Sequence, residues 1–244
     1  MIYVTGDTHG LRDLSRFYSE EFLNKINKAD NYVIITGDSG ITWNDDTMKK
    51  CIEFYSQFKC KFLFIDGNND NFDILDKLPV SKYCNGNVHK ISDNIYHLMR
   101  GEIFDIEGIS FLAFGGADSW DAPIRYCATN RVEGISWWRR ECPSKEEFQN
   151  AINNLKSRNN KVDVILTHEG TSECARFFAS CELDVCNMLD YINKTTDYKY
   201  WFFGHHHHDI NVEKNKKCMF KSFENVNEIL AKNKTNDLDN DKVL

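Results

Sequence analysis

The sequence is short of several features that would assign it to a class of protein. It has only three prolines in 244 residues, and no two of its nine cysteines form a Cys-x-x-Cys pair. No apolar run approaches the roughly 20 residues that a membrane-spanning helix needs. The formal net charge is −7, so no overall positive field draws the chain to nucleic acid or to an anionic membrane. A membrane span is therefore not expected, and a nucleic-acid or nucleotide partner is not supported by charge alone.

The cysteines favour a reducing compartment. Their number is odd, and the chain begins with a strand-like run rather than with a basic segment and a cleavage site. We therefore expect reduced thiols and a cytoplasmic location. A structural zinc ion held by Cys174, Cys181 and Cys186 is an alternative, although these spacings fit no common zinc pattern. The sequence does not indicate the oligomeric state.

Short apolar runs rich in β-branched and aromatic residues recur along the chain, and each ends in a small or polar cluster. Runs of this length and composition predict buried strands. Helix-like stretches at 11–27 and 46–58 separate the first three runs. This alternation predicts βαβ units and a parallel sheet in the N-terminal half. The predicted strands are 2–5, 32–36, 62–65, 109–114, 162–167 and 198–203.

The middle of the chain has a different pattern. Strand candidates at 88–91, 95–98, 103–106 and 109–114 are separated by turn signals, which predicts a run of antiparallel strands. Ser144 and Glu147 form the pattern of a capping box, so a helix is predicted over 145–156. A second helix is predicted over 182–193.

The chain shows no internal repeat and no interdomain linker. The C-terminal residues are polar, charged and poor in aromatic side chains, which is typical of a frayed terminus. We therefore predict one domain over residues 1–225 and a polar tail over residues 226–244.

Side chains able to bind a metal follow five of the predicted strands. In an open α/β sheet, ligands bind at the carboxyl ends of the strands. Carboxylate, imidazole and amide oxygen donors suit manganese, iron, zinc and similar divalent ions. The sequence therefore predicts a metal site at this edge, and its candidate ligands are Asp7, His9, Asp38, Asn68, His168, His205 and His207.

The spacing within this set is also informative. Asp7 and His9 are two residues apart, as are His205 and His207, so each pair points the same way if the strand pleat persists. Glycines beside the candidate ligands allow sharp turns and a close approach of metal or substrate. The carboxylate of Asp38 has the chemistry to bridge two metals about 3.5–4 Å apart.

Five segments of the chain resemble the calcineurin-like metallophosphoesterases, both in their order and in their position after strands. The resemblance extends over about residues 1–210, and it implies an α/β fold, a four-layer αββα sandwich with two mixed β-sheets. A looser similarity over 103–155 is to a bacterial and phage subgroup that resembles serine/threonine phosphatases. The Gly37-Asp38-Ser39-Gly40 segment lacks the Asp-Arg-Gly sequence of the protein phosphatases, which counts against that branch. The segments are Gly6-Asp-Thr-His9, Gly37-Asp38, Gly67-Asn68, His168 and Gly204-His-His-His207.

The resemblance implies a role for each candidate ligand. Asp7, His9 and His207 would hold one metal, and Asn68, His168 and His205 would hold the other. Asp38 would bridge the two ions. The ions are expected to be Mn²⁺, with iron, zinc, cobalt and magnesium as alternatives. A metal-bridging hydroxide would then attack the phosphorus of a phosphomonoester or phosphodiester substrate.

One position departs from the family pattern, which commonly has a histidine followed by an acid after Gly-Asn. Here Asn69 stands in place of that histidine, and Asp70 follows it. Asparagine donates a hydrogen bond but delivers no proton at neutral pH. Asn69 and Asp70 remain the candidate catalytic residues, with Asp70 orienting a neighbour. We expect slower turnover, a substrate with a good leaving group, or another acid nearby.

Several interpretations stay open. Because the usual proton donor is missing, one alternative is a binding or scaffold module that has lost catalysis. A second alternative is a nuclease or a nucleotide pyrophosphatase of the same fold. His89 and His97 are interpreted as structural; the alternative is that one of them supplies the proton that Asn69 does not. Arg100 and Arg131 are candidate phosphate clamps, although structural pairing is preferred. Packing is preferred over base stacking for Trp120, Trp137 and Trp138.

Overall fold

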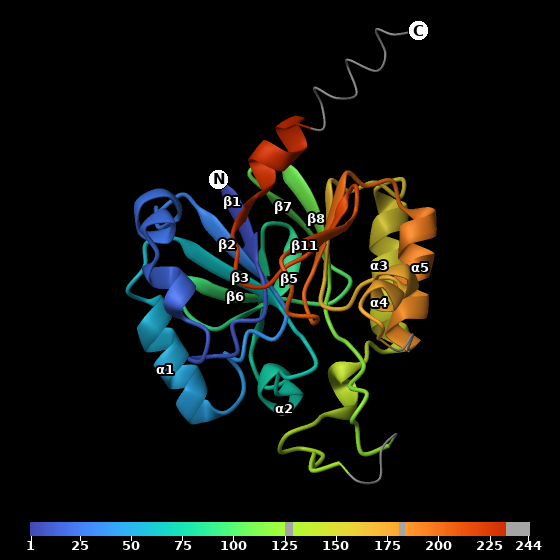
Figure 1. Ribbon diagram of the computed structural model, residues 1–244, viewed down its shortest axis with the longest axis horizontal. Helices are drawn as coiled ribbons and strands as arrows, with labels where there is room; N and C mark the ends of the chain where they lie inside the picture. Colours follow the sequence, from blue (N-terminus) through green and yellow to red (C-terminus); the bar gives the residue numbers. More distant parts are fainter. Residues whose placement is uncertain (125–128, 181–183, 233–244) are drawn as a thin grey trace, which may run out of the picture.

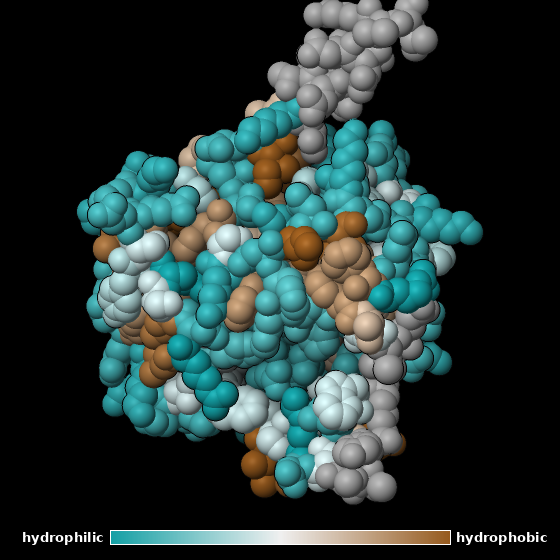
Figure 2. Space-filling model, in the orientation of Figure 1, coloured by the Kyte–Doolittle hydropathy of each residue, from teal (hydrophilic) through white to brown (hydrophobic). Residues whose placement is uncertain are grey.

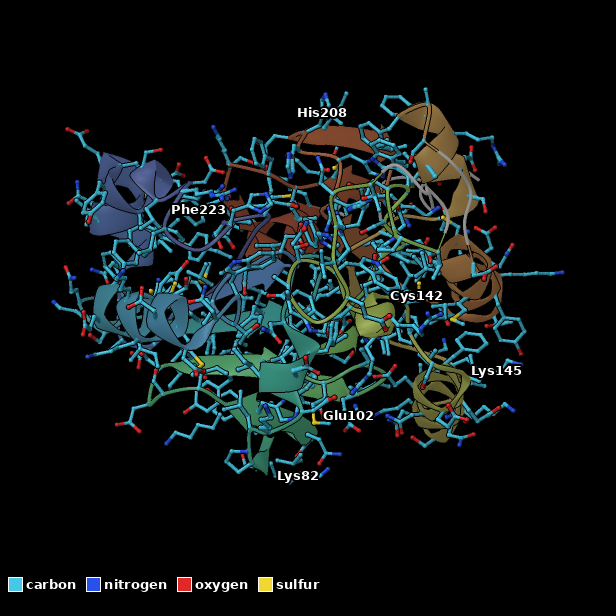
Figure 3. The ribbon with its side chains drawn as sticks, turned by 90° about the horizontal axis from the view of Figure 1, so that it is seen from below. Lys82, Glu102, Cys142, Lys145, His208 and Phe223 are labelled. Atoms are coloured by element: carbon cyan, nitrogen blue, oxygen red, sulfur yellow. The ribbon has the colours of Figure 1, made fainter. Side chains whose placement is uncertain are left out.

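The computed structural model describes residues 1–124, 129–180 and 184–232. Two β-sheets pack face to face, and helices cover the outer face of each sheet (Figure 1). The view from below shows the same order of layers, with helices at both sides and the strands between them (Figure 3). The predicted α/β sandwich with two mixed sheets is therefore confirmed.

The first sheet has the strand order β13-β1-β2-β3-β6-β5-β4 within the described residues. Its four central strands are parallel, and the flanking strands pair antiparallel. The parallel pairing brings the carboxyl ends of β1, β2 and β3 to one edge. The strands are β1 (Ile2–Thr5), β2 (Tyr32–Thr36), β3 (Lys61–Ile65), β4 (Val80–Tyr83), β5 (Gly86–Lys90), β6 (Ile95–Leu98) and β13 (Glu224–Asn225).

The second sheet has the order β11-β12-β10-β9-β8-β7 in the same described ranges. Here β12, β10, β9 and β8 are parallel, and the two outer strands pair antiparallel. The strands are β7 (Ile103–Ile106), β8 (Ile109–Phe114), β9 (Val164–Thr167), β10 (Tyr200–Phe203), β11 (Ile210–Glu213) and β12 (Lys216–Cys218).

Three hydrophobic clusters fill the spaces between the four layers. Strand β2 shows how the sequence produces this, because Ile34 points between the sheets while Val33 and Ile35 point under the outer helices. Strands buried on both faces read as continuous apolar runs, which is why they were visible in the sequence. The first sheet is covered by η1 (Ser15–Tyr18), η2 (Phe22–Ile26), α1 (Asp45–Tyr55) and α2 (Phe72–Leu75), and the second by α3 (Lys145–Ser157), α4 (Ser172–Phe177) and α5 (Asp184–Thr195).

The predicted capping box at the start of α3 is confirmed. The Ser144 hydroxyl accepts from the Glu147 amide at 3.1 Å, and the Glu147 carboxylate accepts from the Ser144 amide at 2.7 Å. Two amide groups that lack a partner inside the helix are satisfied in this way. Helix α3 ends one residue beyond its predicted end.

The predicted helix over 11–27 is wrong. The structure has two short helices there, the 3-10 helix η1 and the π-helix η2. The buried guanidinium of Arg16 donates to the carbonyl of Gly6 at 2.6 Å and to the hydroxyl of Thr5 at 2.8 Å, which anchors η1 to the end of β1. Ser19 then accepts from the Phe22 amide and begins a new turn. These tertiary contacts override the helical periodicity.

The predicted antiparallel run is right for each pair but wrong as a single unit. Strands β5 and β6 pair in the first sheet, whereas β7 and β8 pair in the second. The chain crosses between the sheets at residues 99–102, because Leu98 and Phe104 both pack into the core that the sheets share. Strands β4, β11, β12 and β13 were not predicted. Strands β4, β11 and β13 end their sheets, and β4 and β11 have no buried side chain, so they carry no apolar signal.

Residues 226–232 are helical, and this segment extends the core past the predicted domain limit at residue 225. Val226 is fully buried and Leu230 is 7% exposed, both in the cluster between the sheets. The rest of the predicted tail, 233–244, lies outside the described residues. The division into one domain and a tail stays a prediction.

Cys181 also lies outside the described residues, so the zinc alternative keeps only Cys174 and Cys186, which are both buried. Within the described ranges, no helix is long and apolar enough to cross a bilayer. The face seen in Figure 2 is mainly hydrophilic and carries only separate small hydrophobic patches.

Candidate metal centre

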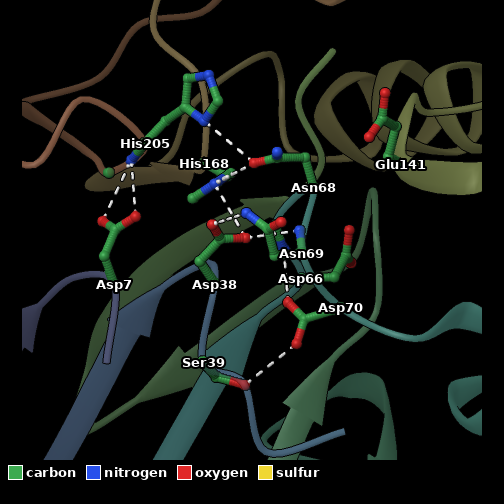
Figure 4. A network of polar contacts seen from close by, with 12 residues as sticks. Asp7, Asp38, Ser39, Asp66, Asn68, Asn69, Asp70, Glu141, His168 and His205 are labelled. Carbon is green, nitrogen blue, oxygen red and sulfur yellow. Dashed lines mark hydrogen bonds and ion pairs between the residues drawn. The ribbon is translucent and has the colours of Figure 1, made fainter. Parts of the chain in front are cut away.

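The seven predicted ligands lie together at the edge where the carboxyl ends of five strands meet. Residues after β1, β2 and β3 reach it from one sheet, and residues after β9 and β10 reach it from the other. Figure 4 shows Asp7, Asp38, Asn68, His168 and His205 pointing toward one another. The sheet-to-sheet packing therefore joins residues that are up to 200 positions apart in the chain.

Asp7, His9 and His207 form the first group. The Nε2 atoms of His9 and His207 are 2.9 Å apart, and Nε2 of His207 lies 3.4 Å from the Asp7 carboxylate. Two imidazole nitrogens on one metal ion are about 3 Å apart, because each metal–nitrogen bond is about 2.1 Å long. The ligand atoms of all three residues lie within 4.8 Å of one another. This geometry fits a divalent ion.

Asn68, His168 and His205 form the second group. The amide oxygen of Asn68 lies 3.2 Å from Nε2 of His168 and 3.1 Å from Nδ1 of His205. An amide oxygen carries no proton, so this oxygen offers lone pairs to both rings. Three donor atoms thus converge from three strands, as in a second metal position.

Asp38 lies between the two groups. Its carboxylate is 3.4 Å from Nε2 of His168, and Asp7, Asp38 and His168 also place their ligand atoms within 4.8 Å of one another. The side chains of Asp7 and Asp38 are almost completely buried. Two buried carboxylates are costly unless a cation compensates them, which matches the expected bridging role of Asp38.

The pKa of His168 shows how strongly this environment favours positive charge. Burial alone would lower the pKa of His168, but the carboxylates of Asp38 and Asp7 raise that pKa to about 10. For Asp38, burial opposes ionisation, yet the charge and the hydrogen bond of His168 hold its pKa well below the usual range. A divalent cation satisfies the same demand, and it replaces the proton on His168.

Neighbouring groups select the ring nitrogen that each histidine directs at the centre. Nδ1 of His168 donates to the carbonyl of Thr36 at 2.8 Å, which directs Nε2 toward the centre. Nε2 of His205 faces the Glu169 carboxylate at 3.5 Å, which leaves Nδ1 toward Asn68. Metal-bound histidines usually donate their other ring nitrogen to a carbonyl or a carboxylate in this way.

Glu169 is a site residue that the sequence reasoning missed. Burial opposes its ionisation, but His205, His206 and the amide of Gly170 lower the pKa of Glu169 to about 2. Its carboxylate accepts from Nε2 of His206 at 2.8 Å, and the His206 ring stacks on Phe178. The only signal in the sequence is that Glu169 directly follows His168, which is too weak to assign a role.

The orientation of the Asn68 amide is also set from outside the ligand set. Its nitrogen donates to the Ser119 hydroxyl at 3.0 Å, and that hydroxyl donates to Glu141 at 2.6 Å. The oxygen of Asn68 must therefore point toward the histidines, as Figure 4 shows. Ser119 and Glu141 come from the long segment after β8, and no motif marks them.

The expectation that a persisting pleat aligns each pair is wrong. Both strands end before the ligands begin, at Thr5 and at Phe203. The ligands Asp7, His9, Asp38, His205 and His207 all have positive φ, between 46° and 68°. Left-handed backbone is uncommon for such residues and persists only where the surroundings enforce it. Tight turns, rather than strand alternation, aim these side chains.

Glycine is required at two positions of the centre. A Cβ atom on Gly37, whose φ is 87°, would collide with the His168 ring, and one on Gly67 would collide with the Asp38 carboxylate. The side chains of the ligands themselves occupy the space next to these glycines. The glycines thus allow the two sheets to bring their ligands into contact.

Asn69 is tied to the Asp38 carboxylate. Its backbone amide donates to one oxygen at 2.8 Å and its side-chain nitrogen donates to the other at 2.6 Å. The oxygen of Asn69 accepts from Arg131 at 3.0 Å, and Arg131 also pairs with Asp121. Asn69 therefore positions Asp38. Its predicted catalytic role stays a prediction.

Asp70 is fully buried behind this contact. It accepts from the Gly67 amide at 2.8 Å and from the hydroxyls of Ser39 and Thr42. Burial and the nearby charge of Asp38 raise the pKa of Asp70 to about 6. The geometry gives Asp70 the task of holding together the two loops that carry Asp38 and Asn68.

The remaining candidates lie away from the ligands. His97 and Arg100 both contact the Asp66 carboxylate, and His89 contacts His97, so these three have structural partners. Among the tryptophans, Trp137 and Trp138 are buried, whereas Trp120 is 69% exposed. These contacts fit the structural roles predicted for Arg100, His89 and His97, and the packing role predicted for Trp137 and Trp138.

Comparison with known protein families identifies a match over residues 1–209, to the family described as calcineurin-like phosphoesterase. No curated protein matches the sequence. The family match covers every candidate ligand from Asp7 to His207 and both sheets up to the end of β10. With the fold and the convergence of the ligands, it shows that this chain belongs to the calcineurin-like phosphoesterase family.

Proposed function

We propose that this chain hydrolyses a phosphomonoester or phosphodiester at a site for two divalent metal ions, Mn²⁺ being the preferred ion. The observation that carries the proposal is the close meeting of donor atoms at the centre. Nε2 of His9 and Nε2 of His207 lie 2.9 Å apart, and two ring nitrogens face the amide oxygen of Asn68. Divalent cations would take the place of the protons that these close contacts otherwise require.

In this proposal Asp7, His9 and His207 hold one ion, Asn68, His168 and His205 hold the other, and Asp38 contacts both. The ions would supply a water of lowered pKa and would offset the charge that builds on the phosphoryl oxygens.

The chain's own groups keep this arrangement rigid. Asn69 fastens both oxygens of Asp38, and Thr36 and Glu169 hold the rings of His168 and His205. Arg131 places a cation against Asn69, next to the centre, where it would offset charge on the substrate.

The first test combines activity with metal content. Purified protein supplied with Mn²⁺ is expected to hydrolyse an activated aryl phosphodiester, and a chelator is expected to abolish the reaction until Mn²⁺ is restored. Elemental analysis of the folded protein is expected to show two ions per chain. Anomalous scattering would place both ions at the seven ligands. A single ion, or ions elsewhere, would contradict the dinuclear proposal.

A non-catalytic binding module is the second candidate, because Asn69 removes the expected proton donor. The intact ligand set and its supporting contacts speak for an enzyme instead. Metal-loaded protein that turns over no phosphoester in a broad panel would establish the binding module. We also propose a cytoplasmic location, supported by the unbridged thiols of Cys51, Cys60, Cys84, Cys174 and Cys218.

A further inference from the structure

A cavity of about 500 Å³ adjoins the candidate metal centre. His9 and Asn69 line it at the side of the centre. The rest of the lining comes from the loop after His9, from the segment between β2 and α1, and from the first half of α1. The volume falls in the range of about 300–1,000 Å³ that is common for small-molecule sites. A substrate whose phosphorus lies at the metals would therefore extend into this cavity.

The charge of the cavity is opposite to that of the chain. The net charge of the chain is −7, yet the lining contains Arg12 and Lys50 and no Asp or Glu. The guanidinium of Arg12 is exposed and makes no hydrogen bond or ion pair within the described residues. Lys50 pairs with Asp46, but both side chains are more than half exposed, so this pair is weak and easily exchanged. The cavity is thus suited to an anionic group.

The same cavity also has an apolar wall. Trp43 and Leu11 line it, and Leu11 is 42% exposed. The Trp43 ring is held edge-on against the buried Trp138, with 5.8 Å between the ring centroids. A fixed aromatic ring beside cationic side chains is suited to a flat base attached to a phosphate.

Asn69 adds a chemical constraint on the leaving group. It lines the cavity at the position expected to face the leaving group, and it delivers no proton. An alkyl alcohol leaves poorly without a proton. A phosphate leaves readily as an anion, because the second pKa of a phosphate ester is about 6. The centre is therefore matched to a leaving group that is itself a phosphate.

We propose, resting on the phosphoesterase function above, that the substrates are nucleoside polyphosphates and that this cavity binds the leaving nucleotide. The oxygen of water forms a bond to the terminal phosphorus, and the bond from that phosphorus to the bridging oxygen breaks. The electron pair of the broken bond stays on the nucleotide. One proton of the water remains on the inorganic phosphate, and the other is released to solvent. Arg12 and Lys50 bind the nucleotide's phosphate, and its base lies on Trp43.

A kinetic comparison tests the cationic contacts. The Mn²⁺-loaded protein is assayed with ADP and with p-nitrophenyl phosphate, which has no second phosphate. Arg12→Gln and Lys50→Gln are expected to raise KM for ADP about 10-fold or more, since a contact to a charged group is lost. The rate with p-nitrophenyl phosphate is expected to change less than about 2-fold, because that substrate has no group for these cations to bind. Lys49→Gln is the matched control, because Lys49 is exposed and neighbours Lys50 without lining the cavity.

A binding measurement separates the base from the phosphate and needs no turnover. Calorimetric titration uses α,β-methylene ADP and methylenediphosphonate, the second being a pyrophosphate analogue without a base. Trp43→Leu is expected to weaken binding of α,β-methylene ADP about 10-fold, from the loss of stacking, and to leave methylenediphosphonate unchanged. Arg12→Gln is expected to weaken both ligands.

The outcomes distinguish this inference from the function beneath it. Metal-dependent cleavage of p-nitrophenyl phosphate without cleavage of ADP would overturn the nucleotide inference and leave the phosphoesterase intact. Equal losses on both substrates in Arg12→Gln would also overturn it. No cleavage of either substrate or of the activated aryl phosphodiester, together with no binding of either analogue, would remove the proposed function itself.

Discussion

Two histidine pairs with almost equal nitrogen–nitrogen distances have different surroundings in this protein. Nε2 of His9 lies 2.9 Å from Nε2 of His207, and Nδ1 of His89 lies 3.0 Å from Nδ1 of His97. At the second pair, Nε2 of His97 contacts the Asp66 carboxylate, so a chain of hydrogen bonds uses each nitrogen between the rings and the acid.

At the first pair, the same nitrogen of His207 faces both His9 and the Asp7 carboxylate, and the ligand atoms of the three residues lie within 4.8 Å of one another. Within the described residues, the pair at His89 belongs to no group of three close ligand atoms. A short distance between imidazoles therefore does not define a metal site. What distinguishes the first pair is a third ligand atom, from the Asp7 carboxylate, close to both ring nitrogens.

The largest expected effect of a substitution is at Asp38, the proposed bridging carboxylate. Asp38→Asn keeps the size of the side chain but removes the charge shared by both groups, so turnover should fall by far more than the 10–100-fold typical of an outer partner. Metal content should fall below two ions per chain. Circular dichroism checks that the protein is folded, and Asp93→Asn, at a fully exposed side chain, is the matched control. Full activity of Asp38→Asn would refute the assignment of the centre.

The second prediction concerns the other pair. Asp66→Asn leaves the buried guanidinium of Arg100 without its main partner, so the free energy of unfolding should fall by about 3–5 kcal/mol. Denaturant unfolding measures this, again with Asp93→Asn for comparison. The metal content of the folded fraction should stay at the wild-type value. A strong loss of metal with little loss of stability would contradict the structural role given to the region of His89 and His97.

The third prediction concerns Glu169. Glu169→Gln keeps a hydrogen-bonding group beside His205 but removes the charge, so metal affinity should fall about 10–100-fold. Competition with a fluorescent chelator measures the affinity. Glu173→Gln, at an exposed position on α4, is the control and should leave the affinity unchanged. Equal affinities in the two variants would deny Glu169 a role in supporting the ligand.

The smallest expected effect is a dependence of stability on pH. Burial, followed by the nearby His97, lowers the pKa of His89 from 6.5 to about 4. The folded state therefore favours neutral His89, and its contribution is fully present above pH 6.5 and is lost as pH falls toward 4. Between about pH 7.5 and pH 5, this loss is about 2 kcal/mol.

His89→Gln tests that dependence, because glutamine donates a hydrogen bond but does not titrate in this range. Denaturant unfolding at the two pH values should show a smaller drop in stability for the variant than for the wild type. Parallel drops would mean that other groups produce the acid sensitivity.

Residue patterns near single strands were enough to predict much of this molecule. Strands such as β2 and β8 are buried on both faces, so their apolar runs mark them locally, and the metal-capable side chains follow them directly. The edge strands and the split helix at 11–27 were missed, because backbone pairing and the buried guanidinium of Arg16 decide them.

By itself, the sequence determined which seven side chains stand at strand ends and that their chemistry suits divalent ions. These are local properties, set by residue type and by the neighbouring apolar run. Only the tertiary structure decided that left-handed turns aim the ligands, that Asn69 fastens Asp38, and that Glu169 supports His205. The physical reason is that a hydrogen bond or a charge contact depends on distance in space. Packing two sheets brings together atoms whose separation along the chain carries no such information.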